Sequence, residues 1–224
     1  METSRTWQRA RRPEQKEQRR QAILAAAGRL LDADGLEGTG LNAIGRAADI
    51  SKANLYRYFE SREAILLELL DEEQEAWIHD LDQRLRRLAG NGDIAAVARA
   101  FGATLARRPR LCVLLTALPS VLERNISAER VMAHKRSALE YLAPMLESLR
   151  SALPGLGDDE ARAFVVQMVM AVCGFWPHCN PAPVVEEVLE LPEFAALRMD
   201  FEATTTHHAE LLLRGLYPSS RIST

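Results

Sequence analysis

One short stretch of the sequence concentrates side chains that can bond to the bases and phosphates of DNA. Lys and Arg bond guanine edges or phosphates, Asn bonds adenine through two hydrogen bonds, and Tyr hydroxyls bond phosphates. Their spacing predicts a helix over residues 51–59, begun by a serine, whose outer face enters the major groove. The residues expected on or beside that face are Ser51, Lys52, Ala53, Asn54, Tyr56 and Arg57.

A recognition helix must be held by neighbouring helices, and the preceding residues predict two of them. A long helix opens at Pro13 and stops at Gly35, and a short helix follows Thr39 as its N-cap. Asn42, on the short helix, is a further candidate for DNA contact. The apolar residues expected to hold the two short helices together are Leu41, Ile44, Ala48, Ile50, Leu55 and Phe59. The pattern is typical of a helix-turn-helix.

Residues 23–66 closely resemble the DNA-binding domain of the TetR family of bacterial repressors. The matching positions are Ala26-Ala27, Leu30-Leu31, Gly35, Thr39, Ile44, Ala48, Ile50-Ser51-Lys52, Leu55-Tyr56, Tyr58-Phe59 and Glu63-Ala64. The resemblance implies phosphate contacts by Thr39, Tyr56 and Arg62, and a phosphate or base contact by Lys52. It also implies a long fourth helix, a divergent helical ligand domain and two C-terminal helices used for dimerisation.

The chain departs from the family pattern at three places. Asp49 replaces the usual turn glycine, which puts an acid near DNA although Asp tolerates a left-handed backbone. Gly45 replaces alanine and is expected to loosen its helix by up to ~1 kcal/mol. Ala53-Asn54 replaces the common Gly-Thr, so the base preference of this chain does not follow from the family.

Helical spacing recurs along the whole chain without a convincing strand pattern, so we expect an all-α protein. A helix over 61–89, capped by Ser61, is expected to connect two domains. Glycine and proline breaks divide the remainder into helices of about 93–107, 109–124 with a kink at Pro119, 127–152, 158–176 and 199–216, with a short one at 184–191. The expected domains are a basic arm with a tri-helical helix-turn-helix at 1–60, a helical-bundle ligand-binding and dimerisation domain at 61–218, and a tail at 219–224.

The helices over 158–176 and 199–216 carry apolar residues on more than one face. Such helices are buried on both sides, either inside one large core or in a four-helix bundle formed with a second copy of the chain. We expect the homodimer. The residues predicted at its interface are Phe164, Phe175, Phe201, Thr205, His208 and Leu212.

A ligand pocket is expected in the second domain mainly because the family resemblance implies one. Each candidate residue taken alone is more often simple core. The candidates mix thioether, aromatic and isolated polar groups: Trp77, Cys112, Thr116, Met132, Lys135, Leu139, Gln167, Met168, Ala171 and Trp176.

Charge is distributed unevenly along the chain. Residues 1–60 carry eleven Lys and Arg against eight Asp and Glu, whereas the whole protein has a net charge of −3. A basic head on an acidic body indicates that the head meets a polyanion. The arginines at positions 5, 9, 11 and 12 either lie along DNA or form a disordered tail.

Other classes of function find little support in the sequence. Cys112, Cys173 and Cys179 form no CxxC pair, and with His178, His207 and His208 they match no standard zinc spacing. We therefore expect no metal and no cofactor, and no nucleophilic triad or phosphate-binding glycine loop indicates an enzyme. The charged N-terminus and the short apolar runs favour a cytoplasmic protein without a membrane span.

These patterns predict a transcriptional regulator that binds a near-palindromic operator in double-stranded DNA as a homodimer. A repressor released by a small-molecule effector is the expected mode, although activation stays open. The alternative is a ligand-binding or scaffolding helical dimer without functional DNA binding.

Overall fold

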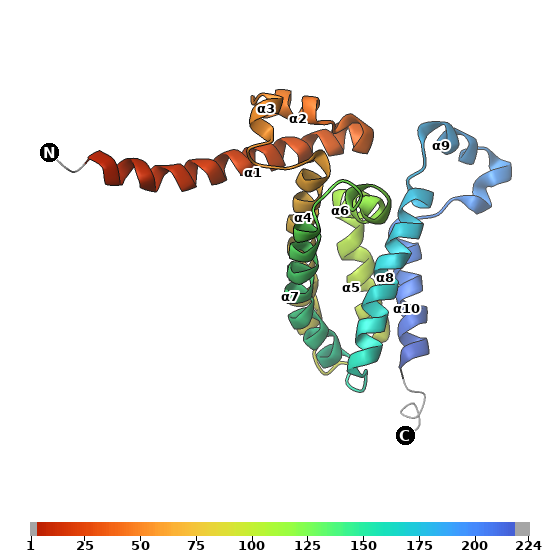
Figure 1. Cartoon of the computed structure of the whole chain (residues 1–224). Coiled ribbons are helices and arrows are strands. Elements are labelled where there is room, and N and C mark those ends of the chain that lie inside the picture. The colour runs from red at the N-terminus through yellow and green to blue at the C-terminus, as the bar shows by residue number, and fades with distance from the viewer. Residues whose placement is uncertain (1–3, 218–224) are drawn as a thin grey trace, which may run out of the picture. The chain divides into compact units, whose positions relative to one another are not determined.

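The structure is a computed structural model that describes the backbone of residues 4–217 and the side chains of residues 13–217. Over residues 4–217 every regular element is a helix, which confirms the predicted all-α class (Figure 1). The elements are α1 Ser4–Gly38, α2 Leu41–Ala47, α3 Lys52–Leu55, α4 Arg62–Arg86, α5 Ile94–Ala106, α6 Pro109–Ala117, the π-helical turn η1 Leu118–Leu122, α7 Ala128–Ala152, α8 Asp158–Cys179, α9 Pro183–Leu189, the 3₁₀ turn η2 Pro192–Leu197 and α10 Phe201–Leu216.

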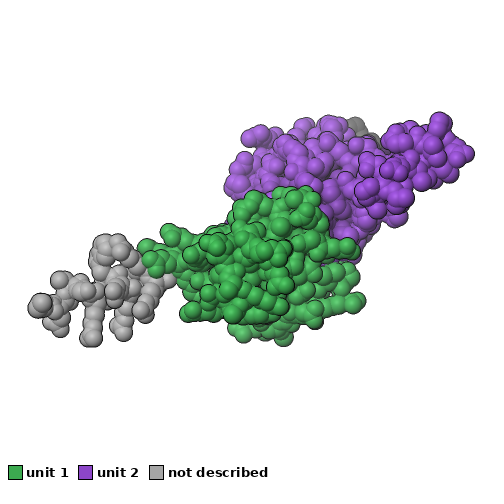
Figure 2. Space-filling view, turned by 90° about the horizontal axis from the view of Figure 1, so that it is seen from above, with its two compact units in different colours: residues 1–70, 119–134 green, residues 71–118, 135–224 purple. Residues whose placement is uncertain are grey.

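The chain forms two compact units (Figure 2). The first comprises residues 1–70 and 119–134, and the second comprises residues 71–118 and 135–224. Both α4 and α7 therefore contribute residues to both units. The domains expected from the sequence, 1–60, 61–218 and 219–224, divide the chain at other places and stay a prediction.

In the first unit, α1 buries the apolar side that its sequence spacing predicts. Ile23, Leu24 and Leu31 are all buried, and Gly35 has a φ of 66°, which ends the regular helix where the sequence predicts a stop. The predicted start at Pro13 is wrong, because α1 begins at Ser4 and Pro13 lies inside it. A proline in a helix interior removes one backbone hydrogen bond and crowds the carbonyl four residues earlier, yet α1 continues through Pro13.

A distant segment completes the first unit. The η1 turn buries Leu122, and the Ser127 amide donates a 2.7 Å hydrogen bond to the Glu60 carboxylate. Glu60 directly follows the predicted recognition helix. Residues 119–134 therefore support the DNA-binding candidate from a position more than sixty residues away along the chain, which no local pattern indicates.

The second unit is a helical bundle in which α5 packs against α10, and α8 packs against both α6 and α10 (Figure 1). Phe101 lies at its centre, with its ring edge-on to Phe164 at 4.9 Å and to Trp77 at 6.4 Å between centroids. Gly102 permits the close approach of α10, since a Cβ at this position would lie 2.0 Å from the Thr206 hydroxyl. The aromatic cluster and the small residue beside it together set the helix spacing in this bundle.

Several predicted helix ends shift by a few residues. α8 continues past Pro177 to Cys179 instead of ending at residue 176, and α4 ends at Arg86 instead of residue 89. At Pro119, where the sequence predicts a kink, the chain changes from α6 to the π-helical turn η1. No single helix in the described part of the chain has the length and apolar character needed to cross a bilayer, although α8 and α9, bent by 75°, meet that test together by length and composition.

Candidate nucleic-acid interface

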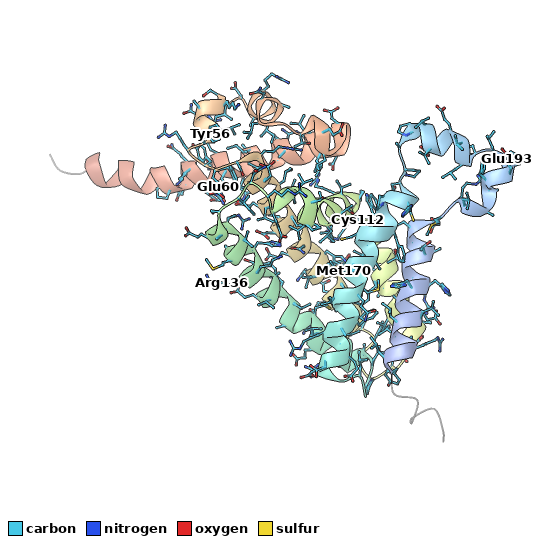
Figure 3. All side chains as sticks on the ribbon, turned by 45° about the vertical axis from the view of Figure 1, so that its right-hand side comes forward. Tyr56, Glu60, Cys112, Arg136, Met170 and Glu193 are labelled. Atoms are coloured by element: carbon cyan, nitrogen blue, oxygen red, sulfur yellow. The ribbon has the colours of Figure 1, made fainter. Side chains whose placement is uncertain are left out.

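The recognition segment presents its polar side chains as the sequence predicts. Ser51 begins α3, and its hydroxyl accepts a 3.3 Å hydrogen bond from the Asn54 amide. Leu55 and Phe59 are buried, whereas the side chains around them are exposed. The exposed set comprises Ser51, Lys52, Ala53, Asn54, Tyr56 and Arg57, and Tyr56 is labelled in Figure 3. The regular helix is shorter than predicted, because α3 ends at Leu55 and the chain continues as a turn to Phe59.

The turn between α2 and α3 depends on two unusual backbone positions. Asp49 has a φ of 52°, the left-handed conformation expected where the family has glycine. A Cβ at Gly45 would lie 2.8 Å from the Ile50 carbonyl oxygen, so the chain closes tightly over this glycine. Gly45 therefore allows the backbone at Ile50 to pass close to α2. The sequence indicates only the low helix propensity of this glycine and not this role.

Thr39 has a structural role instead of the predicted capping role. The N-cap of α2 is Gly40, and the buried Thr39 hydroxyl donates a 2.8 Å hydrogen bond to the Gly35 carbonyl. The side chain is fully covered, so it exposes no group to a phosphate. The backbone of α1 turns at Gly35, and the Gly35 carbonyl oxygen thereby accepts the hydrogen bond of the Thr39 hydroxyl.

Arg62 also serves the fold at this point. Its Nε donates a 2.7 Å hydrogen bond to the Thr39 carbonyl, and its Nη2 donates to the Leu36 carbonyl. The start of α4 is thereby tied to the connection between α1 and α2. About a quarter of the Arg62 side chain stays exposed, so a phosphate contact in addition to these bonds stays a prediction.

Two grooves bring most of the predicted DNA-contact residues together. A groove of about 540 Å³ is lined by Asn42, Ser51 and Lys52, with Arg46 and Asp49 beside them. A second groove, of about 430 Å³, is lined by Gly40, Leu41, Asn42, Lys52, Tyr56, Glu60, Ser61, Arg62, Glu63 and Asn125. Residues from α2, α3, α4 and the 119–134 segment thus share one surface, as a major-groove reader requires.

A third groove adds cations that motif reasoning did not assign. It has a volume of about 1130 Å³ and is lined by Lys16 and Arg19 of α1 together with Arg57 and Tyr58. The only signal in the sequence was the general excess of basic residues in the first 60 positions. The arginines at 5, 9, 11 and 12 belong to α1 by backbone, and their side chains lie outside the described residues. Three guanidinium or ammonium groups beside the recognition segment form a surface suited to phosphates.

Two family models match the chain, and together they cover most of it. The model described as "Bacterial regulatory proteins, tetR family" matches residues 23–69, and "Tetracyclin repressor-like, C-terminal domain" matches residues 71–219. The chain belongs to the TetR family. The helix-turn-helix surface described above is therefore the DNA-binding domain of a TetR-family transcriptional regulator.

Relatives and solved structures agree with this membership. An uncharacterised helix-turn-helix-type transcriptional regulator of Mycobacterium tuberculosis is 28% identical over 188 residues, which cover 74% of this chain and 89% of the relative. The fatty acid degradation regulator FadR of Bacillus halodurans has a TM-score of 0.56 at 17% identity, over 88% of this chain and 96% of its own. FadR of Bacillus subtilis, solved with stearoyl-CoA, has a TM-score of 0.53 at 19% identity, over 87% and 98%. At such identities the structural likeness shows the TetR fold alone.

The residues predicted at the dimer interface divide between the core and the surface of this TetR-family chain. Phe164, Phe201 and Thr205 are buried inside the second unit, where their own chain covers them. Phe175 and His208 are half-buried with their rings edge-on at 5.1 Å, and Leu212 is also half-buried. The large apolar side chains that α8 and α10 expose are Val166, Met170 and Leu211, which are 55%, 63% and 55% exposed, and the interface itself stays a prediction. Helical periodicity located the apolar residues of these helices, but it did not show which stripe the chain itself leaves uncovered.

The predicted ligand residues differ in their exposure, and their role stays a prediction. Trp77, Cys112 and Met168 are buried, and Thr116, Ala171 and Trp176 are half-buried. Met132, Lys135, Leu139 and Gln167 are exposed, and Met132 belongs to the first unit while the others belong to the second. A groove of about 530 Å³ in the second unit is lined instead by Glu72, Glu75, Ala76, Ile78, His79, Asp82, Glu140, Tyr141 and Pro144.

Burial lowers the reactivity of the cysteine thiols. Burial raises the pKa of the Cys112 thiol to about 12, so this sulfur stays protonated and is a poor nucleophile at neutral pH. Burial also raises the pKa of Cys173 and of Cys179. Over the residues whose side chains are described, no three His, Cys, Asp or Glu groups lie together as metal ligands would.

Proposed function

We propose that this TetR-family regulator is a homodimeric repressor that binds a near-palindromic operator and is released by a small-molecule effector. One observation carries the DNA-binding part of the proposal. Within residues 51–57 the polar side chains are exposed, whereas Leu55 and nearby Phe59 are buried. The adjoining grooves are lined by the cations Arg46, Arg57 and Lys16. Buried anchors under exposed donors hold the reading groups in fixed positions against base edges and phosphates.

The homodimer is supported by the uncovered apolar surface of the second unit. Val166, Met170 and Leu211 are large, apolar and mostly exposed on α8 and α10. An apolar surface of this kind favours association with another protein surface. A second copy of the chain with the same surface gives a closed, two-fold symmetric contact, and two recognition segments then meet half-sites about 34–36 Å apart.

The release step is supported by the domain organisation. The matched C-terminal family domain, residues 71–219, contains the helical bundle of the second unit, and only its residues 119–134 belong to the unit that bears the DNA-binding motif. α4 supplies residues to both compact units, so an effector that displaces residues 71–86 acts on the same helix that holds Arg62 at the DNA-binding end. Coupling of this kind typically changes affinity by about 5–150-fold. We place the protein in the bacterial cytoplasm, where its DNA is.

Selection of bound fragments from genomic DNA by the purified full-length protein tests the proposal. An enriched near-palindromic site is expected, bound by two protomers. Asn54→Ala should relax the preference at one or two base positions per half-site, at a cost of about 1–3 kcal/mol each. Equal weakening for every DNA sequence would show that Asn54 only positions the backbone. Failure to enrich any site would favour a ligand-binding or scaffolding dimer without functional DNA binding.

A further inference from the structure

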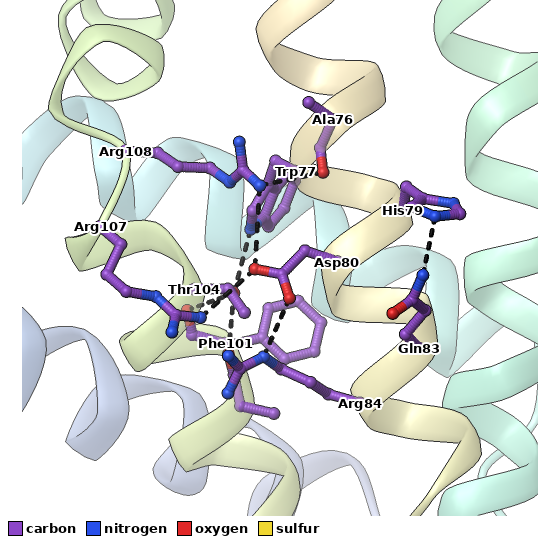
Figure 4. A network of polar contacts seen from close by, with 11 residues as sticks. Ala76, Trp77, His79, Asp80, Gln83, Arg84, Phe101, Thr104, Arg107 and Arg108 are labelled. Carbon is purple, nitrogen blue, oxygen red and sulfur yellow. Dashed lines mark hydrogen bonds and ion pairs between the residues drawn. The ribbon is translucent and has the colours of Figure 1, made fainter.

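Three arginines converge on a single carboxylate at one corner of the second unit (Figure 4). Arg84 of α4 donates from Nε to Asp80 at 3.1 Å, and Arg107 donates from Nη2 to the other carboxylate oxygen of Asp80 at 3.3 Å. Arg108 places its Nη2 3.8 Å from the same oxygen and donates to the Ala76 carbonyl at 3.1 Å. Three positive charges therefore surround one negative charge.

This arrangement is poorly explained as a stabilising ion pair. One carboxylate neutralises one guanidinium, and the other two positive charges are left without a neutralising group in the cluster. Exposed pairs contribute only about 0–1 kcal/mol to stability. The part of the chain with described side chains supplies no second acid to Arg84, Arg107 or Arg108. Among those same residues, most of the five N–H donors on each guanidinium also find no protein partner.

The elements that carry the cluster are held rigidly. Trp77, one turn before Asp80, is buried and donates a 3.1 Å hydrogen bond from its indole N–H to the Thr104 hydroxyl of α5. Thr104 in turn donates to the Ala100 carbonyl at 2.8 Å. Arg107 and Arg108 follow α5 directly, and Arg108 immediately precedes α6. The helices that carry Asp80 and Arg84 on one side and lead to Arg107 and Arg108 on the other are thus joined, and about half of the Arg107 side chain is open to solvent.

We infer that Arg84, Arg107 and Arg108 form a binding site for a phosphate group. Guanidiniums bind the oxygens of a phosphate through parallel, charge-assisted hydrogen bonds, and a dianionic phosphate neutralises the two excess charges. Without a bound anion, the Asp80 carboxylate holds the three arginines around it. When an anion binds, the negative charge of Asp80 opposes it. This site goes beyond DNA recognition, and its occupancy is measured without DNA. The phosphate belongs either to free inorganic phosphate or to the headgroup of a small effector.

Calorimetric titration of the full-length protein, at ionic strength held constant with chloride, tests the site. The probes are inorganic phosphate and n-octyl phosphate. Arg107→Gln and Arg84→Gln should each weaken phosphate binding about tenfold, because each removes a charge-assisted hydrogen bond. Asp80→Asn should strengthen it by about three- to tenfold, because the opposing charge is lost. Arg86→Gln is the matched control, since Arg86 lies on the same helix and pairs with Asp82 outside the cluster.

The outcomes separate the alternatives. Tighter binding of octyl phosphate than of inorganic phosphate assigns the site to an effector with an apolar tail, and equal binding assigns it to free phosphate. Absence of binding to the wild type, weaker binding by Asp80→Asn, or equal loss in Arg86→Gln would each overturn the inference. Competition by random duplex DNA would assign the arginines to the DNA backbone instead. If Asp80→Asn does not fold, as judged by circular dichroism, the exposed Arg107→Gln variant still decides the question.

Discussion

Arg20 of α1 lies across the aromatic ring of Phe59, with its guanidinium carbon 4.7 Å from the ring centroid, and donates two hydrogen bonds to the Glu68 carboxylate. It also donates to the Tyr58 carbonyl at 3.4 Å. One side chain therefore joins α1, the end of the recognition segment and α4. The orientation of the exposed residues on that segment therefore depends on Arg20, whose side chain is 34% exposed.

Replacement of Arg20 by methionine tests this connection. Arg20→Met keeps the apolar stem but leaves the largely covered Glu68 carboxylate without its partner, so we expect a loss of about 1–2 kcal/mol in the free energy of unfolding. Urea denaturation measures the loss. The neighbouring exposed Arg19→Met should change stability by less than about 0.5 kcal/mol. If the double variant Arg20→Met/Glu68→Gln lowers the free energy of unfolding by as much as the two single variants added together, the two side chains are not coupled.

Asp49 places a negative charge in the groove that contains Arg46 and Lys52. Asp49→Asn and Asp49→Gly should both tighten binding to operator and to random DNA, by about three- to tenfold at low salt, because one repulsive charge per protomer is removed. Fluorescence anisotropy at several salt concentrations measures the effect. Tighter binding by the glycine variant alone would identify relief of the left-handed backbone, at φ 52°, as the cause instead of charge.

The groove between α1 and the recognition segment predicts phosphate contacts by Lys16 and Arg19. The double variant Lys16→Gln/Arg19→Gln should weaken operator and random DNA about equally. The slope of log affinity against log salt should become shallower by about 0.9 for each phosphate that the protein no longer neutralises. Arg29→Gln, an exposed arginine on the same helix and outside the groove, is the matched control. An unchanged slope in the double variant would remove α1 from the interface.

The outward apolar surface predicts the effect of a charge on α8. Met170→Asp should convert dimers to monomers in sedimentation experiments, because the carboxylate would be buried unpaired between two copies of the chain. Operator binding should fall with it. Leu139→Asp alters an equally exposed apolar residue on α7 and should leave the dimer intact. A Met170→Asp protein that stays dimeric at micromolar concentration would place the seam elsewhere.

The close approach of α5 and α10 predicts a steric penalty at Gly102. Gly102→Ala should lower the free energy of unfolding by about 1–3 kcal/mol, because the added methyl group would overlap the Thr206 side chain. Thermal unfolding measures the change. Gly215→Ala in α10, where a Cβ meets no atom within 4 Å, should instead raise stability by up to about 1 kcal/mol. Equal stabilisation by both substitutions would show that the two helices separate readily.

The sequence by itself determined the local elements of this protein. Caps and breakers act within a few residues, so Ser51, Ser61 and Gly35 mark helix ends that the structure reproduces. The 3.6-residue period also separated buried Leu55 and Phe59 from the exposed residues around them, since one face of a short helix must cover the core. The family resemblance over residues 23–66 also predicts the DNA-binding function, because that motif is local in sequence.

Only the tertiary structure decided which apolar face meets which neighbour. Periodicity shows that α8 and α10 are apolar on several sides, but covering by α5 makes Phe164 and Phe201 internal and leaves Met170 outside. The tertiary structure also decided the partners of polar groups. Thr39 is suited to capping, yet it is buried and donates to the Gly35 carbonyl. The three arginines of the cluster meet at Asp80 only because α4 packs beside the α5–α6 connection. Contacts between residues far apart in the chain depend on three-dimensional packing, which local spacing does not encode.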